Sequence, residues 1–185
     1  QSTEEALKAL YNETIKIIRK ILPDIPIIFG GIYNTLWPEH SRNVINADYF
    51  ISGPAETQII KLLNNIFNMN ISKNYEKQYY LPDYTLYDKL YSAAVLTTRG
   101  CVFDCAYCAS KKIFRHFFKY PVDDIASLIE YLAVDRYVED IAFYDDALLA
   151  DSKKHFIPLI EKIIKKKLNC RFHLPNAVHI KYIDR

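Results

Sequence analysis

Three of the four cysteines in this chain lie close together, at Cys101, Cys105 and Cys108. Their CxxxCxxC spacing places three thiols on one short loop. Three thiolates there can bind three irons of a cubane [4Fe–4S] cluster and leave the fourth iron without a protein ligand. An iron with an open coordination position can bind and activate a small molecule. The spacing therefore predicts an iron–sulfur cluster that takes part in chemistry.

Zinc is the main alternative occupant of such a loop, with His116 or Cys170 as a fourth ligand. A cluster with four protein ligands that only transfers electrons is a second alternative. A disulfide is not expected, because pairing two of three clustered cysteines would leave an odd thiol in a chain with too few cysteines for a disulfide scaffold. Cys170 alternates with Phe172 and Leu174, and it is predicted to be a buried core thiol.

The composition is that of an ordinary globular protein, with 50% hydrophobic residues, 25% charged residues and a net charge of +2. No apolar run approaches the ~20 residues of a membrane-spanning helix, so no membrane partner is expected. Clustered free thiols favour a reducing compartment, which predicts a cytoplasmic protein. Basic and aromatic residues interleave over residues 111–120, a pattern that can bind single-stranded nucleic acid. Because no wider basic surface accompanies them, we favour packing of these rings on the fold.

Segments typical of helices and of buried strands alternate along the chain, which predicts βαβ units and a mainly parallel sheet. The expected helices cover residues 2–22, 38–46, 55–67, 122–134 and 152–167, and the expected strands cover residues 25–31, 47–53, 92–98, 139–145 and 170–174. A capping box of Ser2 and Glu5 opens the first helix, and Pro158 is expected to kink the last one. The first helix is predicted from residues that recur at helical spacing, namely Leu7, Leu10, Tyr11, Thr14, Ile17, Ile18 and Ile21.

Residues 69–91 interrupt this alternation, because they are polar and rich in tyrosine, and they are predicted to form a linker. The strand that follows runs directly into the cysteine loop. Gly100 is expected to let the chain turn tightly at that point. In parallel α/β sheets, binding sites gather at the carboxyl ends of the strands. The cysteine loop is therefore expected at the functional edge of the sheet.

The segment "TTRGCVFDCAYC", residues 97–108, resembles the signature loop of the radical S-adenosylmethionine superfamily, CxxxCxΦC with an aromatic residue at Φ. Residues 81–90 and 141–151 resemble segments that flank this loop in the branch with an N-terminal cobalamin-binding domain. Further upstream, residues 25–39 and 47–57 resemble the later half of that cobalamin-binding domain.

The resemblance implies that Cys101, Cys105 and Cys108 hold a [4Fe–4S] cluster whose open iron is chelated by S-adenosylmethionine. One electron would then cleave the sulfonium and release a 5′-deoxyadenosyl radical. Tyr107 would lie beside the adenine, and Asp145 and Asp146 would lie where the family contacts the methionine ammonium. An electron donor of the flavodoxin or ferredoxin type is implied as a partner, while the substrate stays open. Some relatives modify transfer RNA.

For the fold, the resemblance implies an α/β chain with two domains. Residues 1–68 would be the C-terminal part of a Rossmann-like cobalamin-binding domain, residues 69–91 a linker, and residues 92–185 the first βα units of a partial TIM-type barrel. Possible cobalamin contacts would fall on Gly30, Gly31, Gly53 and Glu56. Pro54 and Ala55 depart from the family's GEGE pattern at this point.

Three candidate strands after residue 91 are fewer than the family's barrel needs. The sequence therefore resembles an internal piece of a longer enzyme, and we expect no substrate turnover by this chain alone. A partial parallel sheet also leaves an edge strand, here residues 170–174, through which the chain could self-associate.

Overall fold

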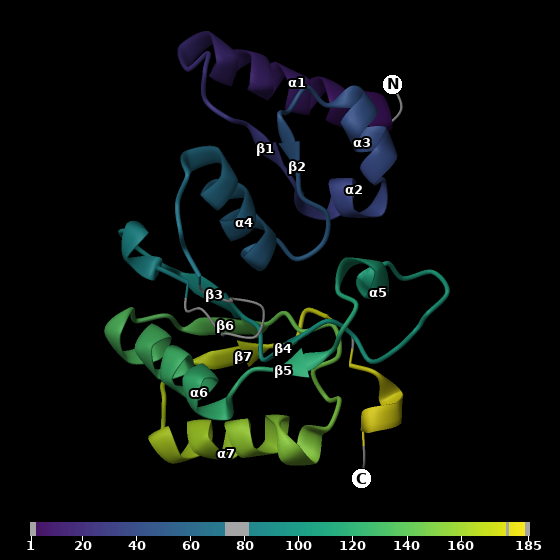
Figure 1. Ribbon diagram of the computed structural model, residues 1–185. Helices are drawn as coiled ribbons and strands as arrows, with labels where there is room; N and C mark the ends of the chain where they lie inside the picture. Colours follow the sequence, from purple (N-terminus) through teal and green to yellow (C-terminus); the bar gives the residue numbers. More distant parts are fainter. Residues whose placement is uncertain (1–2, 73–81, 177, 184–185) are drawn as a thin grey trace. The chain divides into compact units, whose positions relative to one another are not determined.

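The computed structural model describes residues 3–72, 82–176 and 178–183, and the chain divides into two compact units, residues 1–76 and 77–185 (Figure 1). Each unit has its own parallel strand pairing, so the structure is a mixed α/β arrangement, as predicted. Ser2 of the predicted capping box, and residues 73–81 of the predicted linker, lie outside the described residues. None of the helices in the described ranges is long and apolar enough to cross a membrane.

The first unit contains one short parallel strand pair with helices around it. Its elements are α1 (Thr3–Ile21), β1 (Ile28–Phe29), α2 (Gly31–Leu36), α3 (Pro38–Val44), β2 (Tyr49–Phe50) and α4 (Glu56–Phe67). Ile28 pairs with Tyr49, and Phe29 pairs with Phe50. Pro38 occupies the first turn of α3, where its missing N–H costs nothing. The short helix α2 was not expected from the sequence.

The packing face of α1 differs from the predicted one. Among the side chains of this helix that the structure describes, Ile15 is buried, whereas Leu10 and Ile17 are about 60% exposed. Tyr11 and Ile18 of the predicted set are half-buried, so helical spacing selected a mixture of inward-facing and outward-facing residues. Arg19 and Asp48 form an ion pair that ties the end of α1 to the start of β2.

The second unit is built on a parallel sheet in the order β3–β6–β7 (Figure 1). The strands are β3 (Ser92–Val95), β6 (Asp140–Phe143) and β7 (Arg171–His173), and the helices α6 (Val122–Glu130) and α7 (Phe156–Lys166) complete the crossovers. Alternate strand residues Ala93, Val95, Ile141 and Phe143 are buried in one core with the apolar faces of both helices. Among the described strands, β7 pairs with β6 alone, which makes it the edge strand that the sequence predicted.

Several short elements complete this unit. They are β4 (Thr98–Arg99), α5 (Ser110–Ile113), β5 (Phe118–Lys119), a π-helical turn (Tyr131–Asp135) and 3-10 turns at Tyr84–Leu86, Ser152–Lys154 and Ile180–Tyr182. The antiparallel pairing of β4 with β5 was not predicted. The side chain of Tyr84, within the segment predicted to be a linker, is buried in the core.

The last predicted helix is divided rather than kinked. Its first residues form the 3-10 turn, and the backbone breaks at His155 before α7 begins. Pro158 therefore lies in the first turn of α7. A proline is tolerated in that position, because the N–H groups of the first turn have no helical acceptor.

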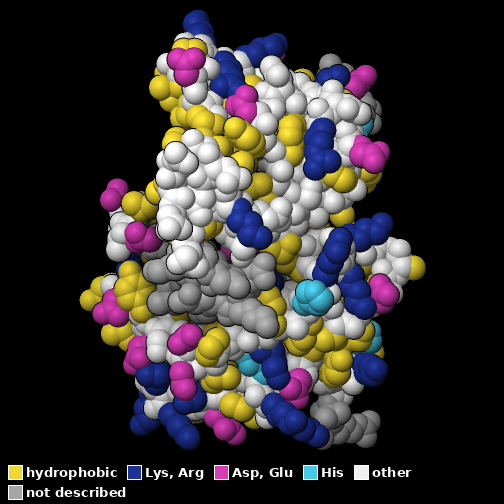
Figure 2. Space-filling view, viewed as in Figure 1, with side chains coloured by type: hydrophobic (Ala, Val, Ile, Leu, Met, Phe, Trp, Pro, Cys, Tyr) yellow, Lys and Arg dark blue, Asp and Glu magenta, His cyan; other side chains and the backbone are white. Residues whose placement is uncertain are grey.

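The basic and aromatic segment packs largely as expected. Phe118 packs against the core and Tyr120 is buried in it, while Lys111, Lys112 and Arg115 are exposed. Figure 2 shows Lys and Arg side chains interspersed with Asp and Glu over the visible face of this unit. Mixed charge of this kind does not form the continuous basic track that a nucleic-acid backbone requires.

Candidate functional site

The segments that leave β3, β6 and β7 meet at the carboxyl edge of the sheet. The Cys101 thiol lies 4.0 Å from the carbonyl oxygen of Asp146, which follows β6. Beyond β7, the Asn176 side-chain amide donates hydrogen bonds to the carbonyl oxygens of Tyr144 at 2.9 Å and Asp145 at 3.2 Å. The cysteine loop therefore lies at the edge where parallel sheets bind ligands.

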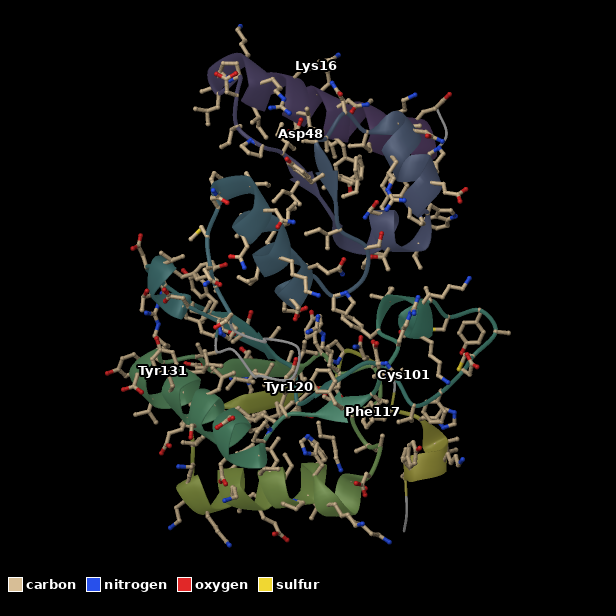
Figure 3. All side chains as sticks on the ribbon, viewed as in Figure 1. Lys16, Asp48, Cys101, Phe117, Tyr120 and Tyr131 are labelled. Carbon is tan, nitrogen blue, oxygen red and sulfur yellow. The ribbon has the colours of Figure 1, made fainter. Side chains whose placement is uncertain are left out.

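The tight approach of two backbone segments explains the glycine that precedes the first cysteine. Gly100 has a φ of +80°, and a Cβ added there would lie 2.7 Å from the carbonyl oxygen of His116. Only glycine fits both the left-handed backbone and the contact. The β4–β5 pair next to it holds the start of the loop, and Cys101 lies beside this pair in Figure 3.

All three thiols of the loop are free, and backbone N–H groups donate to the sulfur atoms of Cys101 and Cys108. The Phe103 N–H donates to Cys101 Sγ at 3.5 Å. Cys108 Sγ lies 3.3 Å from Ser110 Oγ and accepts from the Ser110 N–H at 3.5 Å. These contacts from Ser110, through its hydroxyl and then its N–H, lower the pKa of Cys108, because they favour the thiolate. Metal ligation requires the thiolate, so these contacts prepare Cys108 for it.

Within the described ranges, no group of three His, Cys, Asp or Glu side chains converges closely enough to hold one metal ion. Cys170 packs against the core before β7, and burial raises the pKa of its thiol. Cys170 therefore packs on the core as predicted, although it is half-buried and not fully buried.

Asp145 is engaged by the turn between β3 and β4. Its carboxylate is 2% exposed and accepts hydrogen bonds from the N–H groups of Thr97 (3.0 Å) and Thr98 (2.6 Å). Both threonine hydroxyls also donate to it, at 2.9 Å and 2.6 Å. Four donors on one carboxylate hold the end of β6 against the strand that leads into the cysteine loop.

His155 extends this buried network to the start of α7. Its Nε2 lies 3.0 Å from the carbonyl oxygen of Thr97, so Nε2 carries the proton and donates it. The Tyr120 N–H donates to the same carbonyl at 3.0 Å. Burial lowers the pKa of His155, although the hydrogen bond to Thr97 acts in the opposite direction. The neutral imidazole is therefore the form that this core favours.

Asp146 and Tyr107 present their side chains to solvent at the same edge. The Asp146 side chain is exposed, while its carbonyl oxygen lies 4.0 Å from the Cys101 thiol. Tyr107 is 93% exposed, and the charge of the Cys105 thiolate is the first cause that raises its pKa. The two adjacent aspartates thus have different surroundings, which the sequence did not distinguish.

The four positions suggested for cobalamin surround the turns that follow β1 and β2. Gly31 and Gly53 have positive φ values of +89° and +76°, and a Cβ on Gly30 would lie 3.3 Å from the Ile51 carbonyl oxygen. The Gly53 N–H donates to Thr35 Oγ1 at 2.8 Å. These three glycines therefore have local backbone roles. Glu56 begins α4.

The sequence analysis did not identify three residues of the candidate site in the second unit: Thr97, His155 and Asn176. Thr97 and His155 are buried polar residues whose partners lie 48 and 58 positions away along the chain. The only local signal for Asn176 is its place just beyond a strand and a proline. Contacts of this kind depend on the tertiary fold rather than on spacing.

The comparison with known proteins concerns the second unit. No curated protein matches the chain. Residues 95–183, from the end of β3 through the cysteine loop, β6, α7 and β7, match the family model of the radical SAM superfamily. The part of the chain that builds the candidate site is thus similar to the radical SAM superfamily.

Proposed function

We propose that the second unit binds a [4Fe–4S] cluster through Cys101, Cys105 and Cys108 and takes part in the reductive cleavage of S-adenosylmethionine. One observation supports this proposal most strongly: three free thiols share a loop at the carboxyl edge of a parallel sheet, in a region that matches the radical SAM superfamily. When bound, the cluster would chelate S-adenosylmethionine and pass it one electron, which releases methionine and a 5′-deoxyadenosyl radical.

Within this proposal, the two aspartates have separate roles. Asp146 is exposed, and its carbonyl oxygen lies 4.0 Å from the Cys101 thiol, so its carboxylate can reach the ammonium group of a methionine moiety bound beside the loop. Asp145 already accepts four hydrogen bonds from Thr97 and Thr98, so it positions the turn instead of binding the ligand. Tyr107, exposed in the loop, provides an aromatic face and a backbone amide for the adenine.

Cobalamin is not needed for this proposal. The residues of the first unit suggested as cobalamin contacts are Gly30, Gly31, Gly53 and Glu56. Turn geometry already explains the three glycines. We therefore place the proposed function in the second unit alone. Equilibrium dialysis against hydroxocobalamin tests the first unit separately. Retention of one cobalamin per chain would add cobalamin to the cofactors of the proposed function.

The cleavage needs a one-electron reductant, and a donor of the flavodoxin or ferredoxin type is the partner we expect. Dithionite can replace this donor in a test. Anaerobically reconstituted protein should then release 5′-deoxyadenosine and methionine from S-adenosylmethionine, measured by liquid chromatography. A reduced cluster whose electron paramagnetic resonance spectrum does not change when S-adenosylmethionine is added would contradict the proposal and favour a purely electron-transferring centre.

The aspartate assignment has its own test. Asp146→Asn should weaken S-adenosylmethionine binding by about 1.5–3 kcal/mol, the usual contribution of a hydrogen bond to a charged group, without changing the iron content. Calorimetry on the reconstituted protein measures this difference. An unaltered affinity for S-adenosylmethionine in the variant would show that Asp146 does not bind this ligand.

A further inference from the structure

An aromatic contact joins the cysteine loop to the segment that follows β7. The ring of Phe103, between the first two cysteines, stacks on the His179 imidazole with centroids 4.1 Å apart and an interplanar angle of 21°. The Tyr182 ring lies 5.5 Å from Phe103 at 45°. We name Phe103, His179 and Tyr182 the aromatic clasp. It connects residues that are more than seventy positions apart in the chain.

The segment that carries two of these rings is also anchored to the end of β6. Asn176 donates to the carbonyl oxygens of Tyr144 and Asp145, the residues that precede Asp146. His179 then begins the 3-10 turn Ile180–Tyr182, where its Nδ1 accepts the Lys181 N–H at 3.2 Å. One short segment therefore contacts both the acidic turn after β6 and the cysteine loop.

Burial of aliphatic side chains does not explain why the 3-10 turn lies against the loop. Ile180 is 81% exposed and Ile183 is 57% exposed, so neither packs well into the unit. Instead, the rings of His179 and Tyr182 both contact the Phe103 ring. The centroids of His179 and Tyr182 lie 6.4 Å apart. Aromatic pairs at such separations contribute beyond the area they bury.

Phe103 connects the aromatic clasp to the sulfur atom of Cys101. Its ring lies in the clasp, while its backbone N–H donates to Cys101 Sγ at 3.5 Å. Fixing the ring restricts the backbone of the same residue, and hence the direction of that N–H. The Cys101 thiol also contacts the Asp146 carbonyl oxygen, at 4.0 Å.

We propose that the aromatic clasp is a positioning device that orders the Cys101–Cys105 part of the loop before a metal centre binds. Phe103, His179 and Tyr182 are positioning residues, since their rings act on the sulfur atoms only through the backbone. Ordering the loop in advance reduces the conformational entropy lost when the thiolates are fixed. The consequence for cluster uptake rests on the proposed function, whereas the ordering of the metal-free loop does not.

The first experiment measures how fast the thiols of the metal-free protein react with Ellman's reagent, in a Cys170→Ala background that leaves only the loop thiols. Two substitutions separate the ring of His179 from its hydrogen bond. His179→Asn keeps a side-chain acceptor for the Lys181 N–H and removes the ring, while His179→Phe keeps a ring and removes the acceptor. Ile180→Ala, in the same turn but outside the clasp, is the matched control.

The clasp predicts about two- to tenfold faster thiol reaction in His179→Asn, the range expected when one aromatic pair is lost. His179→Phe and Ile180→Ala should react at the parental rate. Phe103→Leu should resemble His179→Asn. If His179→Phe reacts as fast as His179→Asn, the hydrogen bond and not the ring orders the loop, and the proposal is overturned. Parental rates in both His179→Asn and Phe103→Leu overturn it as well.

The second experiment reconstitutes the same variants and measures iron, sulfide and the electron paramagnetic resonance response to S-adenosylmethionine. His179→Asn should take up less cluster than the parent, and His179→Phe should restore uptake. Parental uptake in His179→Asn would contradict the positioning role. A parent that takes up no cluster would refute the proposed function, and the thiol rates would still decide whether the clasp orders the loop.

Discussion

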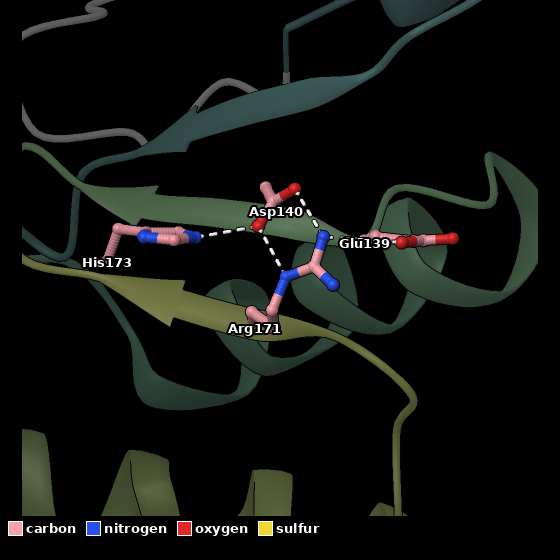
Figure 4. A network of polar contacts seen from close by, with 4 residues as sticks. All are labelled: Glu139, Asp140, Arg171 and His173. Atoms are coloured by element: carbon pink, nitrogen blue, oxygen red, sulfur yellow. Dashed lines mark hydrogen bonds and ion pairs between the residues drawn. The ribbon is translucent and has the colours of Figure 1, made fainter.

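Two aspartates at opposite ends of β6 are held by different kinds of partner. Asp140, at the amino end, accepts hydrogen bonds from Arg171 Nε (2.8 Å), Arg171 Nη2 (2.7 Å) and His173 Nε2 (2.7 Å) across the edge strand (Figure 4). These partners are charged or titratable and open to solvent, with 65% of the Arg171 side chain exposed. Asp145, beyond the carboxyl end, is buried and bonded to the neutral groups of two threonines.

The difference shows which end of the sheet the fold holds rigid. Exposed ion pairs are screened by water and salt and contribute little to stability. A buried carboxylate with four donors is costly to disturb, because each donor would lose its acceptor away from water. The carboxyl edge, where the cysteine loop begins, is therefore fixed by the stronger network, and the amino edge only joins β7 to β6.

Removing Asp145 should produce the largest change. Asp145→Ala leaves the N–H groups of Thr97 and Thr98 buried without an acceptor, so the free energy of unfolding should fall by about 3 kcal/mol or more. Denaturant unfolding followed by circular dichroism measures the loss. Asp146→Ala, one residue further along and exposed, is the control and should change stability little. Equal losses in both variants would remove the distinction between the two aspartates.

Titration of His155 should have the next largest effect. Burial lowers its pKa below the ordinary 6.5, with Lys119 acting in the same direction and Asp145 and Asp151 opposing it. A lowered pKa means that the unfolded chain binds the proton more readily. The contribution of His155 to stability is therefore complete above about pH 6.5 and is lost as the pH falls from there through the folded-state pKa.

The slope should reach up to about 1.4 kcal/mol per pH unit for this single proton. His155→Gln keeps an N–H donor for the Thr97 carbonyl but cannot titrate. Unfolding curves from pH 7 to pH 5 should thus be less steep in pH for His155→Gln than for the parent. The same pH slope in both proteins would show that His155 is not the titrating group.

The smallest change is expected at the amino end. Arg171→Met removes the partner of Asp140 while keeping much of the aliphatic stem. The loss of stability should be less than in either experiment above, and it should disappear at high salt. Because Arg171 and then His173 lower the pKa of Asp140, this contribution is present above about pH 3.8 and is lost at lower pH. A large loss that survives high salt would mean that β7 depends on this network.

The sequence was sufficient for the parts of the fold that follow from local patterns. Alternating strands and helices predicted the parallel β3–β6–β7 sheet, and the strand before Cys101 placed the cysteine loop at its carboxyl edge. Strand alternation also distinguishes the two adjacent aspartates after β6. Ile141, Phe143 and Asp145 are all buried, so period two already separates Asp145 from the exposed Asp146.

Other features could not be predicted, because they depend on partners distant in sequence. The β4–β5 pair consists of two residues on each side, too few to show a period. The break at His155 exists because its imidazole bonds to the carbonyl oxygen of Thr97, which no local pattern indicates. The stacking of Phe103 on His179 likewise requires the end of β7 to lie beside the loop.

The most direct test of the central proposal is the iron, sulfide and zinc content of anaerobically reconstituted protein. The parent and Cys170→Ala should each hold about four irons and four sulfides per chain, since the loop alone supplies the thiolates. Cys105→Ala should lose the cluster while remaining folded. A Cys105→Ala protein with the full complement of iron and sulfide, or a parent that takes up one zinc in place of iron, would contradict a cluster bound by Cys101, Cys105 and Cys108.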